Sequence, residues 1–126
     1  MVTRGKLDDV ETILIVEDDA DLRQLFRITL ALEGYRVLEA RDGVQALHFL
    51  ESDPPDLVIL DLGLPRVSGY LVRQEIAASA RTRDIPVVVV TGMIAPAEQL
   101  KVASLLRKPV SPEQLVETVA ECLRAR

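Results

Sequence analysis

Short apolar runs recur along the chain, and each is bounded by polar or turn-forming residues. Three of them are built of β-branched residues and leucine at successive positions, namely Thr12–Val16, Leu57–Leu60 and Val87–Val90. They are too short for helices, and continuous apolar character is typical of parallel strands that are covered on both faces. Two weaker segments, Tyr35–Ala40 and Ser104–Arg107, complete a set of five predicted strands.

Between these runs, apolar residues repeat with helical spacing. Asp42, Ser68 and Ser111 can cap the N-termini of helices, and Gly34 can end a helix in the left-handed conformation. The predicted helices cover Ala20–Glu33, a segment from Asp42 to just before Pro54, Ser68–Ala80, a short and weakly amphipathic stretch over Ala95–Ala103, and the C-terminal segment from Pro112. The chain is therefore expected to alternate five strands with five helices.

This alternation predicts an α/β fold, a parallel sheet with helices on both faces, because right-handed crossovers permit few other arrangements. A chain of 126 residues with 48% hydrophobic content suits one globular domain. The first eleven residues are mostly polar or charged and are expected to form a flexible N-terminal extension. We therefore divide the chain into the extension, residues 1–11, and one folded domain, residues 12–126.

Polar side chains stand where the predicted strands end. The first strand is followed by Glu17 and Asp18, and later strands by Asp61, Thr91 and Lys108. In open α/β proteins the carboxyl ends of the strands build the binding site at one rim. Carboxylates that crowd together favour a cation among them, and Mg²⁺ prefers a few carboxylates plus water and phosphate oxygens. The pattern indicates a site for a divalent metal and a phosphoryl group, which an ammonium and a hydroxyl could contact.

Charge and composition narrow the possible partners. A net charge of −5 and 3% aromatic residues argue against a surface that binds nucleic acid directly. The single cysteine, Cys122, excludes an internal disulfide and metal sites built from several thiolates. No apolar run approaches the roughly 20 residues that span a bilayer, and the start of the chain lacks the apolar core of a secretory signal. We expect a cytoplasmic protein without a membrane partner.

These residues together resemble the receiver domain of two-component response regulators. The motifs that carry the resemblance are Glu17-Asp18-Asp19 after the first strand, Leu60-Asp61-Leu62-Gly63-Leu64-Pro65 with Gly69 behind it, Thr91-Gly92, and Lys108-Pro109. Their order matches the family from Thr12 to the last helix. The resemblance implies a flavodoxin-like (CheY-like) three-layer fold, with strand order 2-1-3-4-5 in a five-stranded parallel sheet.

The resemblance also assigns roles to individual acids. Asp61 would accept a phosphoryl group from a phosphohistidine on a sensor histidine kinase or on a histidine phosphotransfer protein. Mg²⁺ would be held by Glu17, Asp18, the carboxylate of Asp61 and the backbone carbonyl of Gly63. Asp19 would cap the first helix or contact the metal site from outside. Transfer of this kind is in-line, so positioning and charge neutralisation supply nearly all of the catalysis.

The same resemblance implies a switch. Thr91 would move towards the new phosphoryl oxygens, and Lys108 would pair with them, oriented by a peptide bond to Pro109 that is typically cis. Phosphorylation would thereby change a surface that binds a downstream protein effector. The domain would be an interaction module and not an enzyme.

Two features depart from the family pattern. Only 17 positions separate Thr91 from Lys108, which shortens the region of the fourth helix. Leu105 stands where receivers commonly carry an aromatic residue that moves with the hydroxyl. The usual aromatic switch is therefore absent, and signalling is expected to use a rearranged surface around the shortened helix. In the family, the face between the fourth and fifth helices is the usual partner site, and a homodimer could form there.

Other readings of the same residues stay open. A magnesium-dependent aspartyl-phosphate phosphatase would use a similar nucleophile, but it usually needs a second acid two residues later, where this chain has Gly63. A pseudo-receiver that never takes phosphate would be a pure interaction module. A nucleotide or flavin carrier would need a glycine-rich first loop, which is missing. Arg23, Arg27 and Arg36 are interpreted as a solvated face.

Overall fold

The computed structural model describes residues 10–93 and 101–126. The predicted extension over residues 1–11 falls mostly outside these ranges. The elements follow one another in the order β1 (Thr12–Val16), α1 (Ala20–Leu32), β2 (Arg36–Ala40), α2 (Gly43–Ser52), β3 (Leu57–Leu60), α3 (Gly69–Ala78), β4 (Val87–Thr91), β5 (Ser104–Arg107) and α5 (Pro112–Ala125). All five predicted strands are present, within one residue of the predicted bounds.

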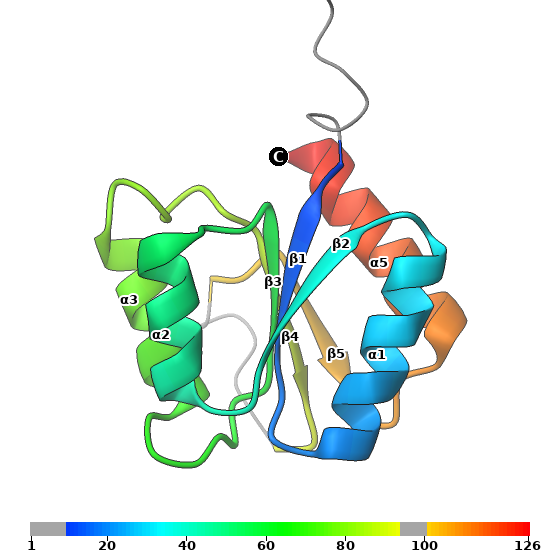
Figure 1. Cartoon of the computed structure of the whole chain (residues 1–126), viewed down its shortest axis with the longest axis horizontal. Helices are drawn as coiled ribbons and strands as arrows, with labels where there is room; N and C mark the ends of the chain where they lie inside the picture. The colour runs from blue at the N-terminus through cyan, green and yellow to red at the C-terminus, as the bar shows by residue number, and fades with distance from the viewer. Residues whose placement is uncertain (1–9, 94–100) are drawn as a thin grey trace, which may run out of the picture.

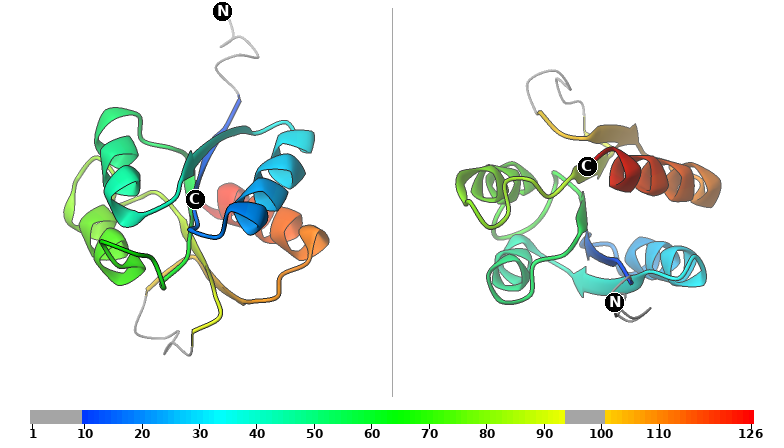
Figure 2. Two further views of the ribbon diagram at one scale, coloured as in Figure 1. Left: turned by 60° about the horizontal axis from the view of Figure 1, so that its bottom comes forward. Right: turned by 90° about the horizontal axis from the view of Figure 1, so that it is seen from above.

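The strands form one sheet in the order β2-β1-β3-β4-β5, which confirms the predicted order. All neighbouring strands are parallel. Helices α1 and α5 cover one face of the sheet, and α2 and α3 cover the other, so the molecule has three layers (Figures 1 and 2). The carboxyl ends of the strands consequently meet at one edge of the sheet, the lower edge in Figure 1.

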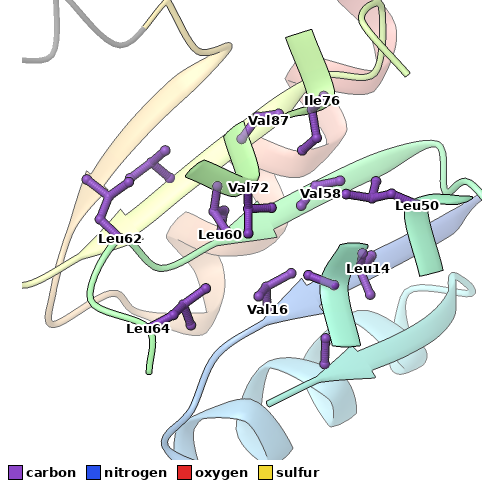
Figure 3. Close-up of a cluster of buried hydrophobic side chains, with 13 residues drawn as sticks. Leu14, Val16, Leu50, Val58, Leu60, Leu62, Leu64, Val72, Ile76 and Val87 are labelled. Atoms are coloured by element: carbon purple, nitrogen blue, oxygen red, sulfur yellow. The ribbon is translucent and has the colours of Figure 1, made fainter. Parts of the chain in front are cut away.

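Alternate residues of the central strands point to opposite faces and build two separate cores. One core joins the sheet to α2 and α3 through residues such as Leu14 and Leu60 (Figure 3). The other joins the sheet to α1 and α5 through residues such as Ile13 and Ile59. Burial of each such side chain stabilises the fold by about 1.5–3 kcal/mol. The double coverage explains why these strands are buried along their whole length and are apolar at all but their terminal threonines.

Polar side chains cap the helices at the predicted positions. The side-chain oxygens of Asp42, Ser68 and Ser111 each accept a hydrogen bond from the backbone N–H three residues later. Gly34, just beyond α1, has a φ of 94°, a left-handed conformation that costs glycine little because it has no Cβ. The helix boundaries are therefore set by local chemistry that is readable from the sequence.

The predicted number of helices is only partly supported. The described residues contain four helices and not the five expected. The expected helix over 95–103 lies outside the described residues except for its last three positions, and these are not helical. Of the helices within residues 10–93 and 101–126, none has both the length and the apolar character that crossing a membrane requires.

Candidate functional site

Three acidic side chains come together at the carboxyl edge of the sheet. Strands β1 and β3 are in register with Val16 opposite Leu60, so the residues that follow leave the sheet at the same level. The N–H of Asp61 extends this ladder by donating to the carbonyl of Val16 at 3.0 Å. As a result, one carboxylate oxygen from each of Glu17, Asp18 and Asp61 lies within 4.8 Å of the other two.

Lys108, directly after β5, reaches this cluster with its ammonium group. Its Nζ lies 2.8 Å from Oε1 of Glu17 and 3.2 Å from Oδ2 of Asp61. Its backbone N–H donates to the carbonyl of Thr91 at 3.0 Å, and its peptide bond to Pro109 is cis, as the resemblance implies. Burial works to lower the pKa of Lys108, but the adjacent carboxylates of Glu17 and Asp61 outweigh it and raise the pKa above its usual value. The side chain therefore stays charged at neutral pH.

Glu17 is almost fully buried, with 2% of the residue exposed. Burial raises the pKa of its carboxyl group above the usual 4.5, and repulsion from Asp61 adds to this, against the opposing effects of Lys108 and the backbone N–H of Asp19. Its Oε2 accepts a hydrogen bond from that N–H at 3.1 Å. Its buried Oε1 has the ammonium nearby but no aligned hydrogen bond from any described residue. A buried oxygen of this kind among other carboxylates fits a hard divalent cation such as Mg²⁺.

The carboxylate of Asp61 is held between two donors. Its Oδ1 accepts a hydrogen bond from the N–H of Gly63 at 3.1 Å, and its Oδ2 accepts one from Nζ of Lys108 at 3.2 Å. Gly69, the first residue of α3, lies against its backbone. A Cβ at Gly69 would be 2.1 Å from the carbonyl oxygen of Asp61 and 2.6 Å from Cα of Leu62. Only glycine therefore fits where α3 begins beside the candidate acceptor.

The last residue of β4, Thr91, and the residues after it form the other end of the rim. Thr91 is fully buried, and its hydroxyl oxygen accepts a hydrogen bond from the N–H of Met93 at 3.1 Å. Gly92 has open space around it, with nothing within 4 Å of a Cβ placed there. The sulfur of Met93 would lie 3.3 Å from a Cβ at Gly63, so this loop approaches the loop after β3. Leu105 is partly buried and packs against the core under α2 and α3.

The remaining residues of the motifs frame the site. Oδ1 of Asp19 accepts hydrogen bonds from the N–H groups of Asp21 at 3.0 Å and Leu22 at 3.1 Å, which confirms Asp19 as the cap of α1. Pro65 is exposed in the loop between β3 and α3. Pro109 and Asp19 line a groove of about 630 Å³ between α1 and the loop that leads into α5.

The interpretation of Arg23 as part of a solvated face is wrong. Its side chain is only 19% exposed. Its Nη1 donates to the backbone carbonyl of Glu17 at 2.9 Å, and its Nε donates to Oε1 of Glu39 at 3.2 Å. Arg27, one turn later, pairs with the same carboxylate, with Nε 3.4 Å from Oε2. The spacing of the two arginines along one side of α1 was visible in the sequence, but the position of β2 opposite them was not.

Comparison with known proteins places the chain among signalling domains. A family model described as the response regulator receiver domain matches residues 13–120. A probable transcriptional regulator of Guillardia theta is 34% identical over 123 residues, which cover 94% of this chain and 47% of that protein. The polar-differentiation response regulator DivK of Brucella ovis is 30% identical over 118 residues, which cover 90% of this chain and 96% of that protein. The chain thus spans about half the length of several relatives and nearly all of others.

Solved structures show the same similarity. A putative response regulator from Chloroflexus aurantiacus has a TM-score of 0.85 at 29% identity, covering 93% of this chain and 99% of that one. The receiver domain of a sensor histidine kinase from Pseudomonas aeruginosa PAO1 has a TM-score of 0.84 at 28% identity, covering 91% and 98%. That structure is described as having a magnesium ion coordinated in the active-site cleft.

Proposed function

This chain belongs to the family of response regulator receiver domains, and from this premise we propose that Asp61 is its phosphoryl acceptor and that Mg²⁺ binds beside it. The domain acts in two-component signal transduction, as a module that is switched by phosphorylation. The observation that carries the proposal is the approach of three carboxyl groups to within 4.8 Å, with the ammonium of Lys108 in contact with two of them.

The acids suit the binding of Mg²⁺. Glu17, Asp18 and Asp61 would supply carboxylate oxygens, and Gly63 its backbone carbonyl. Because Mg²⁺ keeps several coordination positions for water and phosphate oxygens, three carboxylates and one carbonyl leave room for a phosphoryl group. Bound there, the ion would neutralise charge on the phosphoryl oxygens during transfer.

Transfer itself would be an in-line displacement. A carboxylate oxygen of Asp61 forms a bond to phosphorus while the bond from phosphorus to the imidazole nitrogen of a phosphohistidine breaks, and the imidazole leaves and takes up a proton. Gly63 holds Asp61 through its N–H, and Lys108 contributes positive charge next to it. These groups are in place beforehand, so little reorganisation is needed during the reaction.

The sensing of phosphate would use Thr91 and Lys108. A phosphoryl group replaces one carboxylate charge by about −1.5 to −2, by analogy with phosphorylated hydroxyl groups. The hydroxyl of Thr91 accepts a hydrogen bond from the N–H of Met93, and a hydroxyl that accepts can also donate its own proton, here to a phosphoryl oxygen. Movement of Thr91 would carry the loop after β4 with it, which couples the acceptor to the neighbouring surface.

We propose that the partners are a histidine kinase or a histidine phosphotransfer protein upstream and a protein effector downstream. We place the domain in the cytoplasm, with no membrane partner and no direct contact with nucleic acid, and we assign it no turnover of an external substrate. The proposed assembly is a homodimer through the face between the fourth and fifth helices.

A direct test is incubation with Mg²⁺ and acetyl phosphate, followed by intact mass measurement. The wild type is expected to gain the mass of one phosphoryl group, and Asp61→Asn to gain none. Asp53→Asn is the matched control, because Asp53 is an exposed acid at the end of α2 that pairs with Arg36. An adduct that persists in Asp61→Asn, or its absence from the wild type, would overturn the proposal.

The same samples distinguish the rival functions. Steady hydrolysis of phosphate esters would favour an aspartyl-phosphate phosphatase, and the presence of Gly63 in place of its usual second acid argues against it. A folded wild type that neither binds Mg²⁺ nor takes a phosphoryl group would be a pseudo-receiver. The clustered acids and Lys108 do not favour that outcome.

A further inference from the structure

Arg23 makes two contacts that no other described arginine of α1 makes together. Its Nη1 donates to the backbone carbonyl of Glu17 at 2.9 Å, and its Nε donates to Glu39 on β2 at 3.2 Å. Arg27 pairs with Glu39 as well but makes no contact with Glu17 among the bonds of the described residues. The two arginines therefore share Glu39 as a partner, but only Arg23 also binds the backbone of Glu17.

The carbonyl of Glu17 lies where the sheet ends. The ladder between β1 and β2 closes at Val16 and Ala40, and one further bond, from the N–H of Glu17 to the carbonyl of Ala40, extends it at 3.0 Å. The next rung would use the carbonyl of Glu17, but no backbone N–H of β2 reaches it. A carbonyl at a buried residue needs a donor, and the guanidinium of Arg23 supplies one.

This contact fixes the peptide bond between Glu17 and Asp18. The N–H of Glu17 is held by the sheet and its carbonyl by Arg23, so hydrogen bonds restrain the main chain on both sides of Glu17 where the two acids emerge. The ion pair with Glu39 in turn limits movement of the guanidinium itself. The directions of two candidate magnesium ligands thus depend on a side chain that touches neither carboxylate.

We propose that Arg23 is a positioning residue for the magnesium site, acting through the backbone of Glu17. The proposal rests on the proposed function, because it concerns ligands of the ion assigned there. An arginine suits the task since its rigid planar fork presents several donors, so that one can face a carbonyl while another faces a carboxylate. A lysine, with a single ammonium on a flexible stem, would hold the two acceptors less firmly.

The principal experiment measures Mg²⁺ affinity directly by calorimetry in wild type, Arg23→Ala and Arg27→Ala. Loss of a group that orients metal ligands typically costs 10–100-fold in affinity, so we expect Arg23→Ala to bind about tenfold more weakly. Arg27→Ala removes an arginine from the same carboxylate of Glu39 and is expected to bind within about twofold of the wild type, because exposed ion pairs contribute little. Equal affinity in the two variants would overturn the proposal.

A second measurement needs no metal. Amide hydrogen exchange of Asp19 reports its hydrogen bond to Oε2 of Glu17. Exchange at this amide should accelerate in Arg23→Ala and stay unchanged in Arg27→Ala, if Arg23 holds the loop. Should Arg23→Ala be too unstable to study, Arg23→Lys keeps the charge without the fork, and is expected to show a smaller change in the same direction. Unchanged exchange in both Arg23 variants would overturn the proposal.

Phosphorylation by acetyl phosphate separates positioning from a general loss of structure. We expect Arg23→Ala to need about tenfold more Mg²⁺ for half-maximal phosphorylation, with an unchanged rate at saturating Mg²⁺. A purely structural role would lower the rate at all concentrations, which contradicts the proposal.

Asp18→Asn tests the metal site separately. If the wild type binds Mg²⁺ and Asp18→Asn does not, the site stands whatever Arg23 does. A wild type that binds none overturns both proposals.

Discussion

The two ends of the rim are held in different ways. At the acid end, where Glu17, Asp18 and Asp61 follow β1 and β3, side chains and backbone are connected to the two central strands and to Lys108. At the hydroxyl end, Thr91 closes β4 opposite Arg107 of the edge strand β5, and the next residues are held by the bond from the N–H of Met93 to the Thr91 hydroxyl and by a bond from Nη1 of Arg107 to the carbonyl of Met93. The acid end is thus anchored at the centre of the sheet and the hydroxyl end at its edge strand β5, so the two ends differ in what lies behind them.

The first test of this comparison shortens one core side chain next to each end of the rim from Leu to Ala. Leu60 is fully buried just before Asp61, and we expect Leu60→Ala to lower the free energy of unfolding by about 4 kcal/mol, since the cavity lies between packed strands and helices. Leu105 on the edge strand β5 is only partly buried, so less apolar surface is lost, and we expect Leu105→Ala to lower the free energy of unfolding by about 1 kcal/mol. Urea denaturation measures both, and equal losses would contradict the difference between the two ends.

Two glycines provide the next test. In Gly69→Ala the new Cβ would meet backbone atoms of Asp61 and Leu62, neither of which can give way, so we expect a loss of about 3 kcal/mol and impaired phosphorylation. Gly92→Ala places its methyl group in open space, and its effect on stability should stay within about 0.5 kcal/mol. Thermal denaturation of the pair is sufficient. If Gly69→Ala is as stable as the wild type, the acid end is less closely packed than its geometry indicates.

The third test uses pH at the acid end. The pKa of Glu17 is raised above 4.5, so its contribution to the stability of the metal-free protein is present below that pH and is lost as pH rises through the raised value. Stabilisation by Mg²⁺ runs in the opposite direction, because binding needs the carboxylate. At 100 times its Kd, Mg²⁺ should stabilise the protein by about 2.7 kcal/mol at neutral pH and progressively less as pH falls towards 4.5.

Melting temperatures with and without Mg²⁺ across this range measure the third effect, and Glu17→Gln is the control. The variant should lose most of the stabilisation by Mg²⁺ at neutral pH. Any stabilisation that remains should no longer change with the ionisation of residue 17. A wild type whose stabilisation by Mg²⁺ is the same at pH 4.5 and pH 7 would exclude Glu17 as a ligand.

The smallest effect is expected at the hydroxyl end. Thr91→Val removes the acceptor for the N–H of Met93 and should cost about 1 kcal/mol, the usual value of one hydrogen bond. Amide exchange at Met93 should accelerate in Thr91→Val but not in Thr91→Ser, which keeps the hydroxyl. Unchanged exchange in Thr91→Val would mean that other contacts hold this loop.

Much of this architecture is readable from the sequence because it is encoded locally. The buried strands are continuous apolar runs, and Asp42, Ser68 and Ser111 cap helices with their own side chains. The acids after β1 and β3 converge because parallel strands in register must end at one edge. Contacts between distant segments are different. Whether Arg23 faces water or Glu39 depends on the packing of α1 against β2, which no local pattern specifies.

The region between Thr91 and Lys108 shows the same limit. The short spacing was visible, and so was Leu105 in place of an aromatic residue. A weakly amphipathic segment predicted a helix over 95–103, of which only positions 101–103 are described, and these are not helical. A segment of this kind depends on tertiary packing more than on its own propensity. The strands on either side, β4 and β5, were correctly predicted because their apolar residues are determined by burial in the sheet.

The position of the Lys108 ammonium has a consequence for how the domain matures. Because it lies 2.8 Å from Glu17 and 3.2 Å from Asp61, the ammonium already offsets part of the negative charge that these acids bring together. On this arrangement the domain would fold without a divalent ion, and Mg²⁺ would join the ammonium beside the acids. Scarcity of magnesium in the cell would then silence the domain without unfolding it.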